Sequence, residues 1–406
     1  MRTAVMCGLL GLVLAGCGGA PSPEALHRRA LVADLHSDTP LRMRDGFDIG
    51  APHERGDGDM DLARLAEGGV DLQVFACWLP TELPTDSCVA AADLLIDSLL
   101  AQIARHRDRV GLCRTAAEAE EIIASGRLAA LVSIENGVAI ANDLANLGRF
   151  ADRGVRCLAL THTASNAWCI SSADTAPAFV GLTDFGREVV REMNRLGMII
   201  DISHAHPEAV AEVLRISADP VIASHSCVRA LCDHDRNLTD DQIRAIAAAG
   251  GLIGVNFYNG YLSDEWNRVS DSLWRIYRPT LDSLAALSRA EGADSQADSL
   301  RRAERRRIYR EVAARVDSLA PVDVAAVCDH IDYIVRLVGA DYAGFGSDFD
   351  GVPSMPRGLE DCSGLPRITA ELAARGYSES DIRKILGGNF LRVFRRVCDR
   401  SPAASG

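Results

Sequence analysis

The chain of 406 residues lacks several patterns that would assign it to a common class of protein. No GxGxxG motif and no P-loop follows the first apolar run, which removes the main support for a nucleotide-binding fold. A basic surface is also lacking, because the formal net charge is −13, and this argues against nucleic acid as a partner. The twelve cysteines form no CxxC pair and no zinc-ribbon spacing. A hydrophobic content of 48%, by contrast, is ample for a large buried core.

The first 17 residues form a segment of their own. Arg2 supplies a positive start, residues 5–15 are apolar, and LAGC closes the segment at 14–17. The apolar stretch is shorter than the roughly 20 residues that span a bilayer, so it predicts an export signal. The closing tetrapeptide resembles the lipobox of bacterial lipoproteins, which predicts lipidation of Cys17; an ordinary secretory signal with a chance cysteine is the alternative. We therefore expect residues 18–29 to be a tether and the protein to be exported. The lipid would be its only membrane anchor, on the periplasmic or cell-surface side.

Eight short apolar runs recur along the chain, with helical patterns between them. The runs lie at 31–36, 70–76, 129–135, 155–162, 198–204, 220–225, 251–256 and 342–348. Strand, loop and helix therefore alternate, which predicts a parallel α/β fold. The count of eight favours a closed (β/α)8 TIM-like barrel, forming a single domain over 30–398 with a tail at 399–406. One long, charged, helix-prone segment at 263–320 falls between the seventh and eighth runs and predicts a helical insertion on the active-site face.

Six of the eight runs end on or beside residues that can bind a metal or move a proton. These residues are His36 with Asp38, Glu135, His162, His204, His225 and Asp348. A barrel of parallel strands brings all C-terminal strand ends to one face, so they could meet in one pocket. The second run supplies only core in this interpretation, and the seventh leads into the pocket wall.

The residue types suit a site for two zinc ions. His36 and Asp38 are two positions apart, where side chains of a strand point the same way. Zinc takes nitrogen and oxygen ligands, and a carboxylate such as Glu135 can bridge two ions. A water bridging the ions would lose a proton near neutral pH and become the nucleophile. Each residue also has a simpler interpretation, since Asp38 and Asp348 could cap helices and the histidines could be ordinary polar residues. The joint pattern favours the metal site.

Seven motifs together resemble the renal (membrane) dipeptidase family of zinc metallopeptidases. They are DLHSD at 34–38, SIENG at 133–137, LTHT at 160–163, DISH at 201–204, SHS at 224–226, GFGSDFDG at 344–351 and GGNFLRV at 387–393. The resemblance runs from about residue 30 to residue 397 and is interrupted by the insertion. It implies a barrel of the metal-dependent hydrolase type and a metallo-dipeptidase.

The resemblance also implies a role for each site residue. His36 and Asp38 would bind one zinc, His204 and His225 the other, and Glu135 would bridge them. His162 would contact the substrate and stabilise the oxyanion, and Asp348 would take and pass on the proton of the water. Arg236 would bind the C-terminal carboxylate of a dipeptide, with Tyr261 lining the same pocket. Two departures limit the transfer: the insertion is longer than in mammalian members, and Ala164 stands where they have a cysteine.

The leading hypothesis is a two-zinc dipeptidase that acts on dipeptides through a metal-bridged hydroxide and tolerates a D-residue at the C-terminal position. The alternative is another hydrolase on the same dimetal barrel, acting on amides, lactones or β-lactams. Other barrels of that type open with His-x-His and often use a carbamylated lysine; here the opening is His-x-Asp, and no lysine lies near a strand end. A binding protein without catalysis would lack a ligand, and none is lacking. The oligomeric state is left open, with a homodimer as one option.

Overall fold

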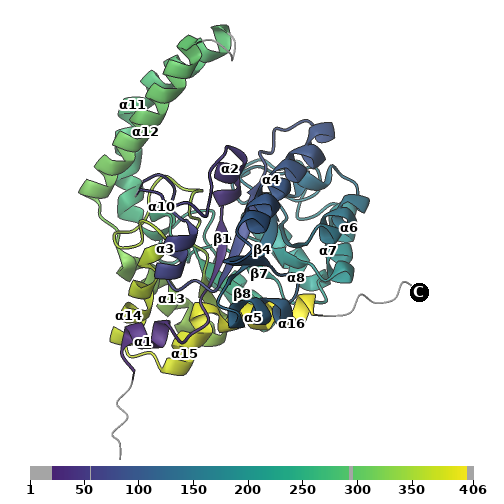
Figure 1. Cartoon of the computed structure of the whole chain (residues 1–406). Helices are drawn as coiled ribbons and strands as arrows, with labels where there is room; N and C mark the ends of the chain where they lie inside the picture. Colours follow the sequence, from purple (N-terminus) through teal and green to yellow (C-terminus); the bar gives the residue numbers. More distant parts are fainter. Residues whose placement is uncertain (1–20, 55, 292–295, 400–406) are drawn as a thin grey trace, which may run out of the picture.

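The computed structural model describes residues 21–54, 56–291 and 296–399 (Figure 1). The predicted export signal with Cys17, residues 18–20 of the predicted tether and residues 400–406 of the predicted tail lie outside the described residues. The rest of the predicted tether differs from the expectation, because Pro23–His27 forms a helix whose His27 is 2% exposed and lies 2.6 Å, Nδ1 to Oγ1, from Thr369. The ten cysteines within the described part of the chain are all free and buried.

Eight parallel strands form the barrel predicted from the apolar runs. They are β1 (Ala33–Ser37), β2 (Leu72–Trp78), β4 (Leu128–Glu135), β5 (Val155–Ala159), β6 (Ile199–Asp201), β7 (Ile222–Ala223), β8 (Leu252–Val255) and β9 (Ala343–Phe345), and they pair in this order. The ring closes between the first and last strands, where the Asp38 N–H donates to the Phe349 carbonyl at 2.9 Å and the Asp348 N–H to the His36 carbonyl at 3.1 Å. A short β3 (Val110–Leu112), which the sequence did not indicate, pairs with β4 outside this series.

Helices surround the strands, as a (β/α)8 barrel requires. They are α1 (Pro23–His27), α2 (Thr39–Arg44), α3 (Leu62–Glu67), α4 (Thr85–Arg105), α5 (Ala116–Ala124), α6 (Ala145–Asp152), α7 (Asp184–Leu196), α8 (Pro207–Ile216), α9 (Asp240–Ala248), α10 (Asn259–Leu262), α11 (Asp264–Glu291), α12 (Gln296–Leu319), α13 (Val324–Val338), α14 (Pro366–Ala374), α15 (Glu379–Arg383) and α16 (Asn389–Cys398). Short 3-10 turns occur at Gly137–Ile140, Ala340–Tyr342 and Cys362–Gly364, and a π turn joins α15 to α16 at Lys384–Gly388.

Local sequence signals explain several helix boundaries. Thr239 and Gln242 form a reciprocal capping box at the start of α9. The Thr183 side chain accepts from the Gly186 N–H at the start of α7, and Gly197 ends that helix with a φ of 65°. The helix α4 is long and apolar enough to cross a membrane by length and composition, but Leu95 and Leu99 on its inner face are buried against the rest of the barrel.

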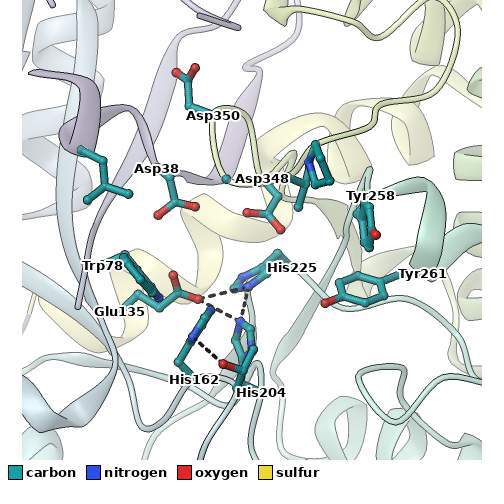
Figure 2. A pocket seen from close by; sticks show the side chains of 15 residues that line it. Asp38, Trp78, Glu135, His162, His204, His225, Tyr258, Tyr261, Asp348 and Asp350 are labelled. Atoms are coloured by element: carbon teal, nitrogen blue, oxygen red, sulfur yellow. Dashed lines mark hydrogen bonds and ion pairs between the residues drawn. The ribbon is translucent and has the colours of Figure 1, made fainter. Parts of the chain in front are cut away.

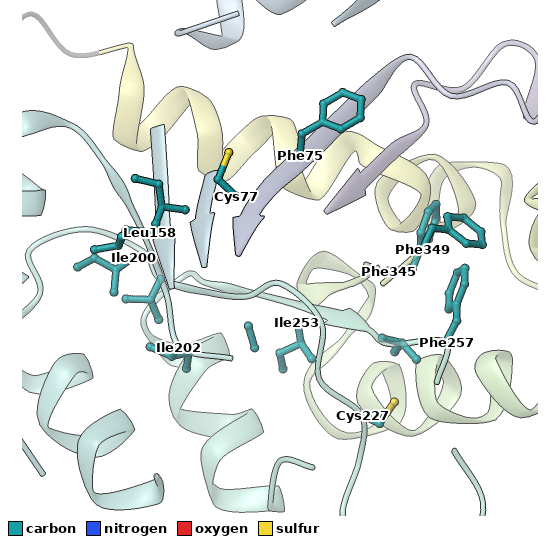
Figure 3. Packing of buried hydrophobic residues seen from close by; sticks show 14 of the residues in the cluster. Phe75, Cys77, Leu158, Ile200, Ile202, Cys227, Ile253, Phe257, Phe345 and Phe349 are labelled. Atoms are coloured by element: carbon teal, nitrogen blue, oxygen red, sulfur yellow. The ribbon is translucent and has the colours of Figure 1, made fainter. Parts of the chain in front are cut away.

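The barrel has an inner and an outer apolar layer. Alternate residues of neighbouring strands, such as Leu72 with Ala129 and Val74 with Leu131, pair in register and share a cluster with Phe390 and Phe394 of α16. The helix α16 therefore closes one end of the barrel. Residues of the opposite parity, such as Phe75 and Cys77, belong to the larger cluster under the outer helices (Figure 3). The opposite end is left for polar side chains.

The predicted insertion is an antiparallel hairpin of α11 and α12 that projects from the barrel (Figure 1, upper left). Leu281, Ile308, Val312 and Val316 are buried within it or at its base. The hairpin follows β8 and α10, as expected for an extended βα loop on the active-site face.

Candidate active site

A cavity of about 340 Å³ opens at the C-terminal ends of the strands (Figure 2). The predicted residues in its lining are Asp38, Glu135, His162, His204, His225, Tyr261 and Asp348. His36 lies just beneath and is only 2% exposed. Residues spread over more than three hundred positions thus meet in one pocket, as the parallel strands require.

The two carboxylate oxygens of Glu135 face two different groups of ligand atoms. Its Oε2 lies 3.5 Å from His36 Nε2, which in turn lies 3.7 Å from Asp38 Oδ2. Its Oε1 lies 2.9 Å from His204 Nε2 and 3.4 Å from His225 Nε2. Those two imidazole nitrogens are 2.9 Å apart. Glu135 ends β4, and a register shift in β1 between Asp34 and Ser37 accompanies the placement of His36 beside it.

These side chains have the electrostatics of a cation site. Burial lowers the pKa of His204 and of His225 well below the ordinary value, so both imidazoles are neutral and offer lone pairs. Burial alone would raise the pKa of Glu135, but His36 and His162 hold it well below its usual range. Burial, reinforced by the negative charges of Glu135 and Asp348, raises the pKa of Asp38 to about 8. Ionisation of Asp38 beside Glu135 and Asp348 is therefore unfavourable unless a positive charge lies between them.

The donor set fits bound metal ions. Among the described residues, His36 Nε2 and Asp38 Oδ1 are buried with no hydrogen-bond partner. Buried polar atoms are normally satisfied, so these two unpartnered ligand atoms indicate that a bound ion completes the site. Three subsets have ligand atoms within 4.8 Å of one another: His36, Glu135 and His225; Glu135, His162 and His204; and His36, Asp38 and Asp348. Imidazole nitrogens and carboxylate oxygens are the ligands that zinc takes in catalytic sites.

Hydrogen bonds that run from His225 through Ser224 to Asp201 fix the orientation of the His225 ring. The Ser224 hydroxyl donates to Asp201 Oδ2 at 2.5 Å and lies 2.7 Å from His225 Nδ1. Since the hydroxyl proton goes to Asp201, the same oxygen accepts from Nδ1–H, which leaves the Nε2 lone pair facing Glu135. Outer partners of this kind fix the tautomer of metal-binding histidines.

His162 and Asp348 lie beside the Glu135 group, on the loops that follow β5 and β9 and not on the strands themselves. The His162 ring lies 4.4 Å from that of His204, and burial lowers its pKa. The Thr163 hydroxyl lies 3.2 Å from His162 Nδ1. Asp348 Oδ1 is 4.0 Å from His36 Nε2, while its Oδ2 accepts from Asn256 Nδ2 at 2.8 Å. One oxygen of Asp348 is thus held by the protein, and the other faces the cluster.

Arg236, the predicted carboxylate-binding residue, is not among the residues that line the cavity and is 5% exposed. Its Nη1 donates to Ser226 Oγ and its Nη2 to the His225 carbonyl, both at 3.0 Å. Its Nε is buried and has no hydrogen-bond partner among the described residues. The guanidinium carbon lies 5.6 Å from the centre of the Tyr261 ring, so Arg236 packs against a residue that lines the cavity.

The sequence analysis did not predict several residues that line the cavity. Trp78, the last residue of β2, lines the cavity, so the prediction that the second run supplies only core was wrong. Its ring lies 5.3 Å from that of His162, and its register partner is Glu135. The signal was available, because Trp78 stands at an even spacing from the inward-facing Leu72 and Val74. Tyr258 and Asp350 also line the cavity; Asp350 lies within the GFGSDFDG motif but was assigned no role, and no sequence pattern marked Tyr258.

Comparison with known proteins agrees with this geometry. The family model described as membrane dipeptidase (peptidase family M19) matches residues 22–405. The chain belongs to the membrane dipeptidase family. The family resemblance and the barrel predicted from the sequence are therefore confirmed.

Relatives within the family include mammalian proteins. Dipeptidase 3 of Rattus norvegicus is 31% identical over 382 residues, and the Homo sapiens protein is 30% identical over 383 residues. Either alignment covers 92% of this chain, which spans 66% of the length of each relative.

Two solved bacterial structures are similar to this chain over nearly its whole length. The probable dipeptidase PvdM from Pseudomonas aeruginosa superposes with a TM-score of 0.78 at 29% identity, covering 93% of this chain and 98% of that one. A metallopeptidase from Rhodobacter sphaeroides, liganded with a phosphinate mimic of the dipeptide L-Ala-D-Ala, superposes with a TM-score of 0.72 at 26% identity, covering 91% and 99%.

Proposed function

We propose that this protein is a zinc-dependent dipeptidase that hydrolyses the peptide bond of free dipeptides. The observation that carries the proposal is the position of Glu135, whose two oxygens face two separate sets of nitrogen and oxygen ligands. His36 and Asp38 would hold one zinc ion, His204 and His225 the other, and Glu135 would be shared. When bound, two such ions polarise a carbonyl and lower the pKa of a water molecule.

Proton transfer falls to Asp348 in this proposal. Its Oδ2 is occupied by the Asn256 amide, so Oδ1, which faces the cluster, is the atom that accepts a proton from the attacking water. The same atom then delivers that proton to the amine of the departing residue, because the free amine is the better base once the bond breaks.

His162 would stabilise the oxyanion as a neutral donor. Its lowered pKa keeps the imidazole uncharged near neutral pH. If Nδ1 accepts from the Thr163 hydroxyl, its proton lies on Nε2 and can be donated to the carbonyl oxygen as negative charge develops there.

Arg236 and Tyr261 would recognise the C-terminal carboxylate. The buried guanidinium keeps an unused Nε–H beside the Tyr261 ring, and an always-charged donor suits a carboxylate. Tolerance of a D-residue at the C-terminal position is supported by the Rhodobacter sphaeroides relative, which was crystallised with a mimic of L-Ala-D-Ala.

Location and assembly belong to the same proposal. The LAGC tetrapeptide supports lipidation of Cys17 and anchoring to a bacterial membrane on its outer side. A homodimer stays a prediction.

A substrate panel tests the proposed function. The mature chain, loaded with zinc, is expected to hydrolyse L-Ala-L-Ala and L-Ala-D-Ala and to leave a simple lactone and a β-lactam much less affected. A preparation that hydrolyses the lactone or the β-lactam but neither dipeptide would favour the alternative hydrolase.

A further inference from the structure

The helical insertion is tied to the cavity through one carboxylate at its base. Asp317, near the end of α12, accepts three hydrogen bonds at a single oxygen, Oδ1. The donors are Trp266 Nε1 at 2.7 Å, Ser354 Oγ at 2.7 Å and Asn259 Nδ2 at 3.1 Å. Each comes from a different segment: α11, the loop after β9, and α10.

All three donors are buried, so the contacts are shielded from water. Trp266 is 3%, Ser354 4% and Asn259 1% exposed. Hydrogen bonds to a charged acceptor are stronger than neutral ones, and a buried donor left without its acceptor destabilises the fold. The three segments are therefore held together at Asp317.

One branch from Asp317 leads to the aromatic wall of the cavity. The Trp266 ring lies 5.4 Å from that of Tyr258, which lies 4.9 Å from that of Tyr261. Tyr258 and Tyr261 both line the cavity (Figure 2), and Tyr261 stacks beside Arg236. Displacement of Trp266 would reach this wall through direct ring contacts.

The second branch leads to the loop that follows β9. Ser354 comes directly after Val352 and Pro353, which line the cavity. Asn259 Nδ2 also lies 2.6 Å from Ser354 Oγ and donates to the Met355 carbonyl at 3.1 Å, so α10 and this loop are tied to each other as well. The loop and the aromatic wall thus share one attachment point.

We propose that Asp317 is a positioning residue, through which the insertion sets the shape of the pocket for the C-terminal residue of the substrate. This inference rests on the proposed function, because Arg236 and Tyr261 mark the carboxylate end of a dipeptide. Asp317 touches no ligand atom of the metal cluster, so its effect falls on substrate selection and not on the chemical step. The projecting part of the hairpin is not needed for this role.

Asp317→Ala and Asp317→Asn are the principal variants. Asp317→Ala is expected to raise KM about tenfold for dipeptides with a bulky C-terminal residue, to change kcat by less than about twofold, and to weaken discrimination among C-terminal residues only. Asp317→Asn keeps an acceptor oxygen and is expected to restore most of the selectivity. Asp271→Asn, at an exposed position of α11, is the matched control and should behave as the wild type.

A variant with a shortened hairpin tests whether the projecting part of α11 and α12 is needed in addition to Asp317. Replacing residues 278–305 by a short Gly-Ser turn keeps Trp266, Asp317 and the Trp274–Tyr309 ring contact of 4.9 Å, and should leave KM and selectivity unchanged. If Asp317→Ala does not fold, Ser354→Ala removes one branch alone and is expected to raise KM in the same direction.

Hydrogen exchange gives a readout that does not depend on peptidase activity. Asp317→Ala should increase exchange of backbone amides at 258–262 and 352–357, with Asp271→Asn unchanged. Wild-type KM and selectivity in Asp317→Ala, with the wild type active on dipeptides, would overturn this inference alone. A wild type inactive on every dipeptide would instead refute the proposed function. Unchanged exchange at both segments would refute the Asp317 link itself.

Discussion

Replacement of Arg236 by methionine tests carboxylate recognition in depth. Methionine keeps the apolar stem but removes the charge and all five N–H donors. Arg236 is 5% exposed, and both of its Nη atoms already bind within the protein, to Ser226 and to the His225 carbonyl. The substitution therefore has two effects: loss of a charged partner for the substrate and disturbance of the loop that carries His225.

The expected magnitude follows from hydrogen bonds to charged groups. Such a bond contributes about 1.5–3 kcal/mol, which corresponds to a loss of roughly 10–150-fold in kcat/KM. Disturbance of the His225 loop would add a loss that is the same for every substrate. The two effects can be separated with a second substrate that lacks the carboxylate.

The assay compares a dipeptide with its C-terminal amide, in the wild type and in Arg236→Met. For the free acid, kcat/KM should fall by about 100-fold, and for the amide by only a few-fold, because the amide never forms the charged contact. Arg236→Lys should be intermediate, since an ammonium group keeps the charge but not the planar fork. Equal losses for acid and amide would refute carboxylate recognition by Arg236 and leave it a structural residue.

Three further predictions concern other parts of the molecule. Burial lowers the pKa of His330 to about 4, against an ordinary value of 6.5, so the folded protein favours the neutral imidazole. The free energy of unfolding should therefore fall by about 3 kcal/mol as the pH falls from 6.5 to 4. In urea unfolding, His330→Gln should show a flatter dependence on pH over that range. A Cβ at Gly351 would overlap Asp38 Oδ2 and Asp348 Oδ1, so Gly351→Ala should lose bound zinc by elemental analysis, whereas Gly148→Ala, with open space around it, should not. Cys17→Ser should move the protein from the membrane fraction to the soluble fraction on cell fractionation, and retention in the membrane would contradict lipid anchoring.

The barrel was predictable because each of its strands is a short apolar run with its own boundary signals. The residues at the ends of those runs were harder to place. His204 and Asp348 come three residues after the last residue of β6 and of β9, with φ values of 68° and 66°. Such left-handed backbone is rare for residues other than glycine and depends on surrounding contacts. Sequence periodicity therefore located these side chains on the correct face but not on the loops that carry them.

The side chains that hold the site residues in place could not be predicted from the sequence. Ser224, which bridges Asp201 and His225, and Asn256, which holds Asp348, carry ordinary polar side chains. Their importance arises from contacts between different strand ends, which lie 23 positions apart for Ser224 and Asp201 and 92 apart for Asn256 and Asp348. Asp317 is a stronger case, because it lies in a charged helical segment where any acid would be expected to face solvent.

A zinc titration of the metal-free protein tests the central claim most directly. Chelator-treated chain is titrated with zinc while hydrolysis of L-Ala-D-Ala and of L-Ala-L-Ala is followed, with Glu135→Gln as the matched variant. The account predicts that activity in the wild type rises until two zinc ions are bound per chain and that Glu135→Gln binds zinc more weakly and stays inactive. Two zinc ions bound to the wild type without hydrolysis of either dipeptide would contradict it.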